Sequence, residues 1–271
     1  MRIAVIVTTY NWPSALAAVL RSLARQSYDD YQVLVADDGS GPDTASLIEQ
    51  AAQTFPVSLT HVWQADDGFR AAAARNRAAA ASDADYLVFL DGDCLVRPDF
   101  LRSHVRLARD KRFVAGNRVL LNPALSERVL SQDLEAEAWG PRDWLNHRLR
   151  GELNRILSLA SLPDGRWRDR SPTRWQGVKT CNLGLWREDF QAVNGFDERY
   201  QGWGYEDSDL TIRLIRNGVL RRDGRFATTV LHFWHREHER EGTEANLARL
   251  HALEQGEGDV WAKQGVDQYQ I

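Results

Sequence analysis

Four apolar runs with the character of strands alternate with helical segments in the first third of the chain. The run "IAVIVT" (3–8) is continuous and β-branched, as expected for a strand buried on both faces. The segment "SALAAVLRSLARQ" (14–26) repeats its apolar residues at helical spacing, at positions 16, 19, 20 and 23. The alternation continues with strands at 31–38, 57–63 and 84–93 and helices at 43–55 and 69–82. This repetition predicts an α/β fold with a mostly parallel central sheet flanked by helices.

Polar residues follow each of the four predicted strands. They are Thr8, Thr9, Tyr10 and Asn11, then Asp37, Asp38, Gly39 and Ser40, then Asp66, Asp67 and Gly68, and finally Asp91 and Asp93. Ligands of parallel α/β sheets bind at the carboxyl ends of the strands, so we expect these residues to meet at one edge. One acidic strand end is explained by a turn or a helix cap. Several carboxylates at one edge repel one another unless a cation or hydrogen-bond donors compensate.

A second acidic cluster lies in "GWGYEDSDL" (202–210). Gly202 and Gly204 allow a tight turn that presents the indole of Trp203. Three acids then begin a predicted helix: Glu206, Asp207 and Asp209. The helix dipole alone favours acids at this position, but it does not account for a tryptophan between two glycines. The segment is therefore a candidate part of a functional site.

Two histidines close the later apolar stretch "VLHFWH" (230–235). Imidazole can join carboxylates on a divalent ion, so a histidine at a strand end suggests a metal ligand in a chain that also contains "DGD". His232 directly ends the apolar run and is the preferred candidate. His235, three residues further on, remains open as an alternative.

Residues 117–176 differ in composition, with tryptophans at 139, 144, 167 and 175. A stripe at helical spacing is formed by Leu145, Leu149, Leu153, Ile156, Leu157 and Ala160. It predicts a helix that packs on the sheet, and the alternative is an amphipathic surface that contacts lipid or a lipid-linked acceptor. Residues 163–175, with four arginines against two aspartates, are predicted to be a loop that is either mobile or faces an acceptor.

Composition excludes several classes of protein. A net charge of −4 and a pI near 6.0 argue against nucleic-acid binding. Two cysteines are not a disulfide framework and suit a reducing cytosol, and Cys94 is predicted to be a packing residue. No signal peptide and no run approaching about 18 apolar residues is present. Neither a phosphate-binding "GxxxxGK[ST]" nor a dinucleotide-binding "GxGxxG" follows the first strand.

These motifs together resemble the inverting family 2 glycosyltransferases, which have the GT-A fold. "VIVTTYNWPSALAAVLRSLARQS" with "VLVADDGS" resembles the uridine-binding half of that family, and "YLVFLDGDCLVRPDFL" resembles its Asp-x-Asp metal motif. The segment "CNLGLWREDFQAVNGFDERYQGWGYEDSDLTIRLIRNG" is similar to one in the β-1,4-galactosyltransferases and bacterial chondroitin polymerase. The resemblance implies three parts: a nucleotide-sugar half at 1–116, a variable helical and loop insertion at 117–176, and an acceptor-binding and catalytic half at 177–271 with a helical tail.

The resemblance also implies roles for individual residues. For the donor these are Thr8 and Tyr10 around the uracil, Asp38 on the nucleoside with Asp37 helping to orient it, Arg75 near the base or diphosphate, and Asp91 near the ribose. Asp93 and His232 would hold Mn²⁺ or Mg²⁺, and Gly92 would keep both carboxylates near the ion. Asp207 would be the general base, Glu206 would bind a sugar hydroxyl, and Trp203 with Gly204 would contact a sugar. Tyr205 is a departure, because the galactosyltransferases have glycine there.

The resulting prediction is an inverting hexosyltransferase that moves Gal, Glc or an N-acetyl form from a UDP-sugar to a saccharide. The acceptor is free or lipid-linked, in bacterial surface polysaccharide or lipopolysaccharide synthesis. The resemblance implies a cytoplasmic protein, with peripheral contact at the inner face of the plasma membrane as a variant. A sugar-1-phosphate nucleotidyltransferase is the alternative, but "TTYNWPS" lacks the glycine-rich basic loop that it requires. A non-catalytic sugar-binding module would not need every one of these acids. The sequence makes no prediction of oligomeric state.

Overall fold

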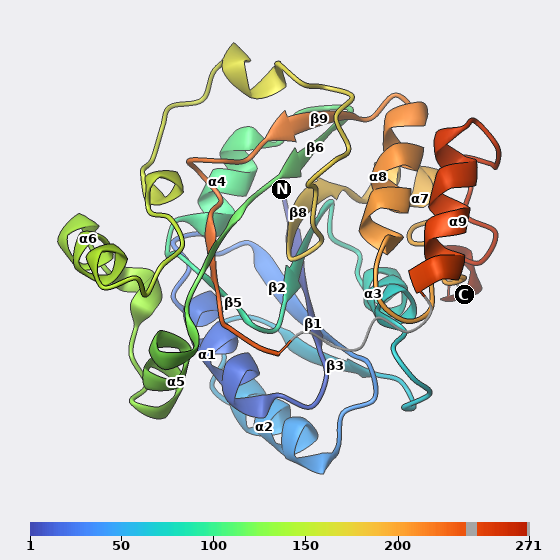
Figure 1. Ribbon diagram of the computed structural model, residues 1–271. Coiled ribbons are helices and arrows are strands. Elements are labelled where there is room, and N and C mark those ends of the chain that lie inside the picture. The colour runs from blue at the N-terminus through green and yellow to red at the C-terminus, as the bar shows by residue number, and fades with distance from the viewer. Residues whose placement is uncertain (237–242, 270–271) are drawn as a thin grey trace.

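The structure is a computed structural model that describes residues 1–236 and 243–269 (Figure 1). A seven-stranded sheet forms its centre, in the order β3-β2-β1-β4-β8-β6-β9. In that order the strands are β3 (Leu59–Trp63), β2 (Tyr31–Asp37), β1 (Ile3–Thr9), β4 (Tyr86–Asp91), β8 (Asn182–Trp186), β6 (Arg112–Ala115) and β9 (Leu220–Asp223). The first four strands in this order are mutually parallel, which confirms the predicted arrangement.

The later part of the chain completes the same sheet. Strand β8 lies between β4 and β6 and runs antiparallel to both, while β9 pairs in parallel with β6 at the edge. Four of the six strand pairings are therefore parallel, as expected of a mostly parallel sheet. The two halves expected at 1–116 and 177–271 share one sheet and are not separate layers.

Helices cover both faces of the sheet (Figure 1). They are α1 (Pro13–Ala24), α2 (Pro42–Ala52), α3 (Ala71–Ala80), α4 (Phe100–Leu107), α5 (Pro123–Ser131), α6 (Pro141–Leu149), α7 (Arg187–Ala192), α8 (Glu206–Arg216) and α9 (Thr243–Glu254). Successive strand residues point to opposite faces, so the continuous apolar runs supply two cores. Ile3, Val5 and Val7 pack with α1, α2, α4 and α5 on one face. Ala4 and Ile6 pack with α3, α7 and α8 on the other.

A small second sheet pairs the strand that follows the "DGD" motif with the strand that ends at His232. It contains β5 (Cys94–Val96), β10 (Val230–His232) and β7 (Arg118–Leu120), in that order. Strands β5 and β10 are antiparallel, with Cys94 opposite His232. The pairing of these two strands therefore brings residue 232 beside the end of β4, as the predicted metal site requires.

The predicted helical stripe across residues 145–160 is wrong beyond Leu149, where α6 ends. Gly151 adopts a φ of +70°, in the left-handed region, and the next residue turns back. The carboxylate of Glu152 accepts a hydrogen bond from Arg128 at 2.7 Å and lies 2.6 Å from a ring nitrogen of His147. These contacts hold the chain against α5 and α6. They leave the side chain of Leu149 exposed, as are those of Leu145 and Leu157.

Among residues 1–236 and 243–269, no helix has both the length and the apolar character that crossing a bilayer requires.

Candidate functional site

The carboxyl ends of β1, β2, β3 and β4 lie at one edge of the sheet. The register places Thr9 beside Asp37, Thr8 beside Asp91, and Asp37 beside Trp63. The polar residues predicted to share an edge are thus brought together. Their roles in binding a ligand remain predictions.

Asp37 and Asp38 are both buried and hold the loops of this edge in place. Asp37 accepts a hydrogen bond from the backbone N–H of Ser40 at 2.8 Å, and its other oxygen lies 2.8 Å from His61 Nε2. Asp38 accepts hydrogen bonds from the Gln64 amide at 2.6 Å and from the backbone N–H of Arg70 at 2.7 Å. Each carboxylate oxygen can accept a second hydrogen bond, so these aspartates could contact a nucleoside while keeping the hydrogen bonds described above.

The Tyr10 ring stands at the open side of this edge. Its side chain is 43% exposed, and its hydroxyl donates to Asp66 at 3.0 Å. This hydrogen bond raises the pKa of the Tyr10 hydroxyl, so the ring stays neutral. An exposed neutral aromatic face beside Asp38 is suited to stacking on a planar base.

Gly92 makes the close turn between the two aspartates of "DGD". Its backbone N–H donates to the Thr8 carbonyl at 2.7 Å. A Cβ added there would lie 3.0 Å from that carbonyl oxygen and 3.2 Å from Thr9. The absence of a side chain is therefore what lets the chain turn back against β1. As a result Asp91 and Asp93 emerge close together.

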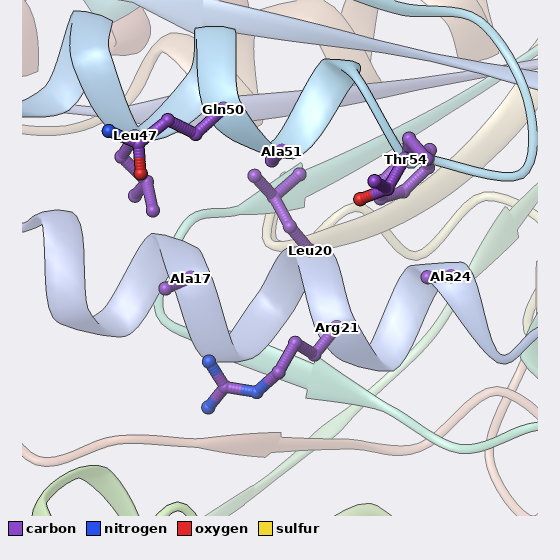
Figure 2. A pocket seen from close by; sticks show the side chains of 9 residues that line it. Ala17, Leu20, Arg21, Ala24, Leu47, Gln50, Ala51 and Thr54 are labelled. Carbon is purple, nitrogen blue, oxygen red and sulfur yellow. The ribbon is translucent and has the colours of Figure 1, made fainter.

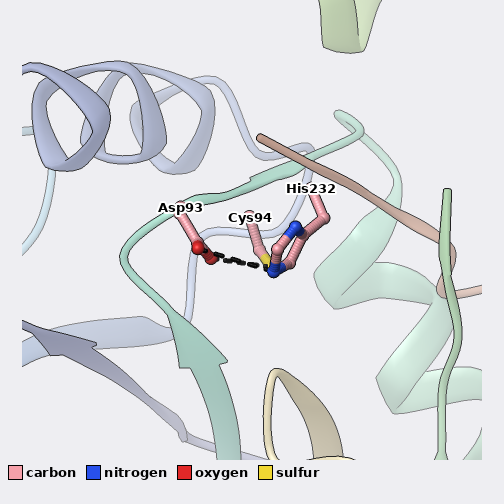
Figure 3. A group of neighbouring side chains, drawn as sticks. All are labelled: Asp93, Cys94 and His232. Atoms are coloured by element: carbon pink, nitrogen blue, oxygen red, sulfur yellow. Dashed lines mark hydrogen bonds and ion pairs between the residues drawn. The ribbon is translucent and has the colours of Figure 1, made fainter. Parts of the chain in front are cut away.

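Asp93 lies against both histidines of the later strand. Its Oδ2 is 3.5 Å from His232 Nε2 and 3.4 Å from His235 Nε2. Ligand atoms of Asp93, Cys94 and His232 all lie within 4.8 Å of one another, and Figure 3 shows these three side chains gathered together. The structure therefore brings both candidate histidines to the same carboxylate.

The chemistry of these side chains fits a hard divalent cation. Burial lowers the pKa of His232, which keeps its imidazole neutral and able to coordinate. Burial, with the nearby Asp91 carboxylate, raises the pKa of Asp93, while His232 opposes that rise. Burial also raises the pKa of the Cys94 thiol well above its ordinary value, so that sulfur is not a thiolate ligand. One carboxylate and one imidazole without thiolate suit Mn²⁺ or Mg²⁺ better than Zn²⁺.

Arg75 joins this edge to the second acidic cluster. Its side chain is only 5% exposed and contacts protein partners, and its place near the base or diphosphate stays a prediction. It donates to Thr8 Oγ1 at 3.0 Å, to Glu206 Oε1 at 3.1 Å and to Asp91 Oδ1 at 3.2 Å. One guanidinium thus connects β1, β4 and the first turn of α8.

Asp207 is nine-tenths buried and lies beside Glu206 in the first turn of α8. Its Oδ2 pairs with Lys179 Nζ at 3.2 Å, and its Oδ1 accepts from the Ser208 hydroxyl at 3.2 Å. Burial, with the charge of Asp207, raises the pKa of Glu206, and Arg75 opposes the rise. Lys179 compensates the charge of Asp207, while Arg75 compensates that of Glu206.

The glycine-flanked turn presents Trp203 next to these acids. Gly202 and Gly204 have φ of +75° and +92°, which glycine adopts readily, and Tyr205 also has a positive φ of 77°. Asn246 of α9 donates to the carbonyls of Gln201 at 2.9 Å and Gly204 at 3.2 Å. The indole of Trp203 is 38% exposed. The C-terminal helix therefore holds the turn, and the aromatic ring reaches the surface.

Sequence reasoning did not identify Lys179, Asn246 or the linking role of Arg75. Lys179 follows a loop without periodicity, and Asn246 lies in a helix whose polar residues show no motif. The partners of Arg75 come from three distant segments, so no local spacing indicates them. Cys94 was predicted to be a packing residue, and its raised pKa agrees with an inert thiol, although the side chain borders the Asp93 cluster.

A groove of about 340 Å³ also lies between α1 and α2, lined by Ala17, Leu20, Leu47 and Ala51 (Figure 2). It is formed by the carboxyl-terminal halves of both helices. Those halves run back toward the amino-terminal ends of the strands, opposite the edge described above. The groove therefore takes no part in this site.

Comparisons with known proteins match this chain to families of glycosyltransferases. The model of "Glycosyl transferase family 2" matches residues 4–160, and that of "N-terminal domain of galactosyltransferase" matches residues 169–238. Validoxylamine A glucosyltransferase of Streptomyces hygroscopicus subsp. jinggangensis is 30% identical over 80% of this chain and 52% of its own length. Chondroitin synthase of Escherichia coli is 24% identical over 81% of this chain and 33% of its own length. The chain thus spans about half or less of these relatives.

Solved structures share the fold. The mannosyltransferase PcManGT from Pyrobaculum calidifontis, in complex with GDP-Man and Mn²⁺, superposes with a TM-score of 0.63 at 20% identity, covering 95% of this chain and 65% of that one. S. aureus TarS in complex with UDP-GlcNAc gives a TM-score of 0.60 at 14% identity, covering 89% of this chain and 61% of that one. At this identity the likeness shows the fold, which is that of the GT-A glycosyltransferases. The first family model covers more than half of the chain, and the chain is a glycosyltransferase of family 2.

Proposed function

We propose that this enzyme is a metal-dependent inverting hexosyltransferase that uses a UDP-sugar and glycosylates a hydroxyl of a saccharide acceptor. The sugar is Gal, Glc or an N-acetyl form, and the acceptor belongs to a bacterial surface polysaccharide or lipopolysaccharide. Relatives named as a glucosyltransferase and a chondroitin synthase support hexose transfer. Similar structures that hold Mn²⁺ or UDP-GlcNAc support the donor class.

The donor would bind along the carboxyl ends of β1, β2 and β4. Tyr10 would stack on the uracil beside Thr8, and Asp38 would accept a hydrogen bond from the nucleoside while Asp37 fixes its loop. Asp91 would contact the ribose, since Arg75 holds its Oδ1 but leaves Oδ2 available. Arg75 itself acts as a positioning residue in this account and not as a direct ligand.

Asp93 and His232 would hold the divalent ion. His235 also contacts the Asp93 carboxylate and would help to orient it. When bound, such an ion offsets the negative charge that develops on the departing UDP. The protein contributes the orientation of its two ligands. Phe233 donates its N–H to the Asp93 carbonyl at 2.9 Å, which fixes the two strands that carry them.

Asp207 would be the general base. It would take the proton of the acceptor hydroxyl as that oxygen attacks the anomeric carbon from the face opposite UDP, so the configuration inverts. A positioned base contributes about 10²–10⁴-fold to the rate. Glu206 would hold a sugar hydroxyl, and Trp203 would stack on a sugar ring.

The observation that carries this proposal is the Arg75 guanidinium, which contacts Thr8, Asp91 and Glu206 at 3.0–3.2 Å. Through it, the predicted donor edge and the turn with the predicted base are parts of one rigid cluster. This contact supports a single site in which donor and acceptor would lie together.

The test is turnover of a panel of UDP-sugars with Mn²⁺ and with EDTA, for wild type and Asp207→Asn. We expect EDTA to abolish transfer and Asp207→Asn to lower kcat by at least about 10²-fold with unchanged donor affinity. Asp67→Asn is the control, because it makes the same change at an acid of the predicted donor edge that is 82% exposed. Transfer that survives both EDTA and Asp207→Asn would contradict the mechanism.

A further inference from the structure

A strongly basic cavity of about 520 Å³ lies between the loop that ends at Lys179 and the edge strand β9. Eight of its lining side chains are arginine or lysine, and only one, Asp223, is acidic. The whole chain has a net charge of −4, so this concentration of positive charge is local. Its position leaves out the predicted donor residues, since neither Asp38 nor Asp93 lines it.

Within the part of the chain that the structure describes, most of these cationic side chains form no ion pair with a carboxylate. Over residues 1–236 and 243–269, no carboxylate forms an ion pair with Arg118, Arg155, Arg170 or Arg174. The buried Arg168 pairs with Asp164 at 3.6 Å and donates to the carbonyls of Asp223 at 2.8 Å and Arg225 at 2.7 Å.

The cations also act on one another. Burial lowers the pKa of Arg221, and the charges of Arg174 and Arg225 lower it further, whereas Asp223 opposes this. Like charges held together in a concave site destabilise the unliganded protein. An anion bound among them would relieve the repulsion.

The cavity borders the predicted reaction centre on two sides. Lys179 lines it and pairs with Asp207 at 3.2 Å. Cys181 also lines it and lies close enough to Cys94, next to Asp93, to raise the pKa of the Cys94 thiol. A ligand in the cavity therefore lies beside the predicted base and beside the predicted metal site.

We propose that this cavity is an acceptor subsite for an anionic saccharide, one that carries a phosphate or a carboxylate group near the hydroxyl that is glycosylated. The inference rests on the proposed transferase function and specifies the acceptor class. The concave shape favours a discrete anionic group over a flat membrane surface, and the indole of Trp167 in the lining offers a face to a sugar ring. Lys179 would link recognition of the anion to the position of Asp207.

The test is binding of glucose 6-phosphate, glucuronic acid and glucose, measured by calorimetry or ligand-observed NMR. Saturating UDP and Mn²⁺ are present so that the donor site is filled. We expect at least one of the two acids to bind about tenfold or more tightly than glucose, to be displaced by inorganic phosphate, and to weaken with added salt. The tighter acid identifies the anionic group.

The variant Arg155→Glu/Arg170→Glu/Arg174→Glu reverses three exposed charges of the cavity. It is expected to lose this selectivity, with about a tenfold or larger drop in affinity for the acid. Arg142→Glu/Arg148→Glu/Arg150→Glu makes the same charge change on exposed residues in and just after α6, outside the lining, and is expected to bind like wild type. UDP binding and thermal denaturation show that each variant is folded.

Equal affinity for the acids and glucose, or wild-type affinity in the cavity variant, would overturn the inference. So would a cavity variant that keeps sugar-acid binding but no longer sediments with phosphatidylglycerol vesicles, because the surface would then serve a membrane. Failure of wild type to bind UDP with Mn²⁺ would instead overturn the proposed function. The two failures are thus distinguishable.

Discussion

Arg75→Met is expected to loosen the cluster that joins the two halves of the site. The variant keeps an unbranched side chain of similar length but removes the guanidinium. Glu206, whose side chain is 13% exposed, then loses its cation, as does Asp91, whose side chain is 31% exposed. Breaking a buried ion pair costs about 3–5 kcal/mol, and the partly exposed Asp91 contributes less because water screens it. We therefore predict that the free energy of unfolding falls by about 2–4 kcal/mol.

Urea denaturation at neutral pH, followed by circular dichroism, measures this loss. Arg77→Met is the matched control, because Arg77 lies on the same helix, is exposed, and stacks on Tyr269 with 5.0 Å between its guanidinium carbon and the ring centroid. Its expected cost is about 0.5–1 kcal/mol. In a double-mutant cycle, Glu206→Gln should recover part of the loss in the Arg75→Met background. Equal costs for the two arginine variants, or strict additivity with Glu206→Gln, would refute the reasoning.

Two further variants test the packing around the site. Burial lowers the pKa of His104 to about 3. Below about pH 6.5 the unfolded chain therefore binds a proton that the folded chain does not, and the folded state becomes less stable as the pH is lowered. When the pH is lowered from about 7 to 5, the free energy of unfolding of His104→Phe should fall by about 2 kcal/mol less than that of wild type. His251→Phe, at an exposed position, is the control and should follow wild type. The same pH dependence in His104→Phe and wild type would contradict this. Gly92→Ala should lower the free energy of unfolding, measured in urea, by about 1–3 kcal/mol, because the new Cβ would lie 3.0 Å from the Thr8 carbonyl oxygen. Unchanged stability would contradict this and would mean that β1 moves to make room.

The parallel half of the sheet could be predicted from sequence because its information is local. Each run such as "IAVIVT" is long enough to identify a strand, and the helix between two strands fixes their parallel order. The polar residues then follow from where each strand ends. The position of Asp91, Gly92 and Asp93 at the edge of the sheet was predicted in this way, whereas the acids that begin α8 were noted from the glycine-flanked turn before them.

The remainder depends on pairings between distant segments. Strand β8 inserts between β4 and β6, which precede it by about ninety and seventy residues, and nothing in its own pattern gives that position. The stripe at 145–160 has helical spacing, yet Gly151 and the contacts of Glu152 end the helix early. The basic cavity is likewise assembled from four segments, so only the fold shows that its charges converge.

Binding of UDP in the presence of Mn²⁺ or EDTA, measured by calorimetry for wild type and Asp93→Asn, tests the central claim most directly. Asp67→Asn is the control, because Asp67 lies at the same edge but is 82% exposed and pairs with Arg70 at 3.6 Å. The account predicts that EDTA weakens UDP binding about tenfold or more in wild type and in Asp67→Asn, and has no effect on Asp93→Asn. Undiminished Mn²⁺-dependent binding in Asp93→Asn would contradict it.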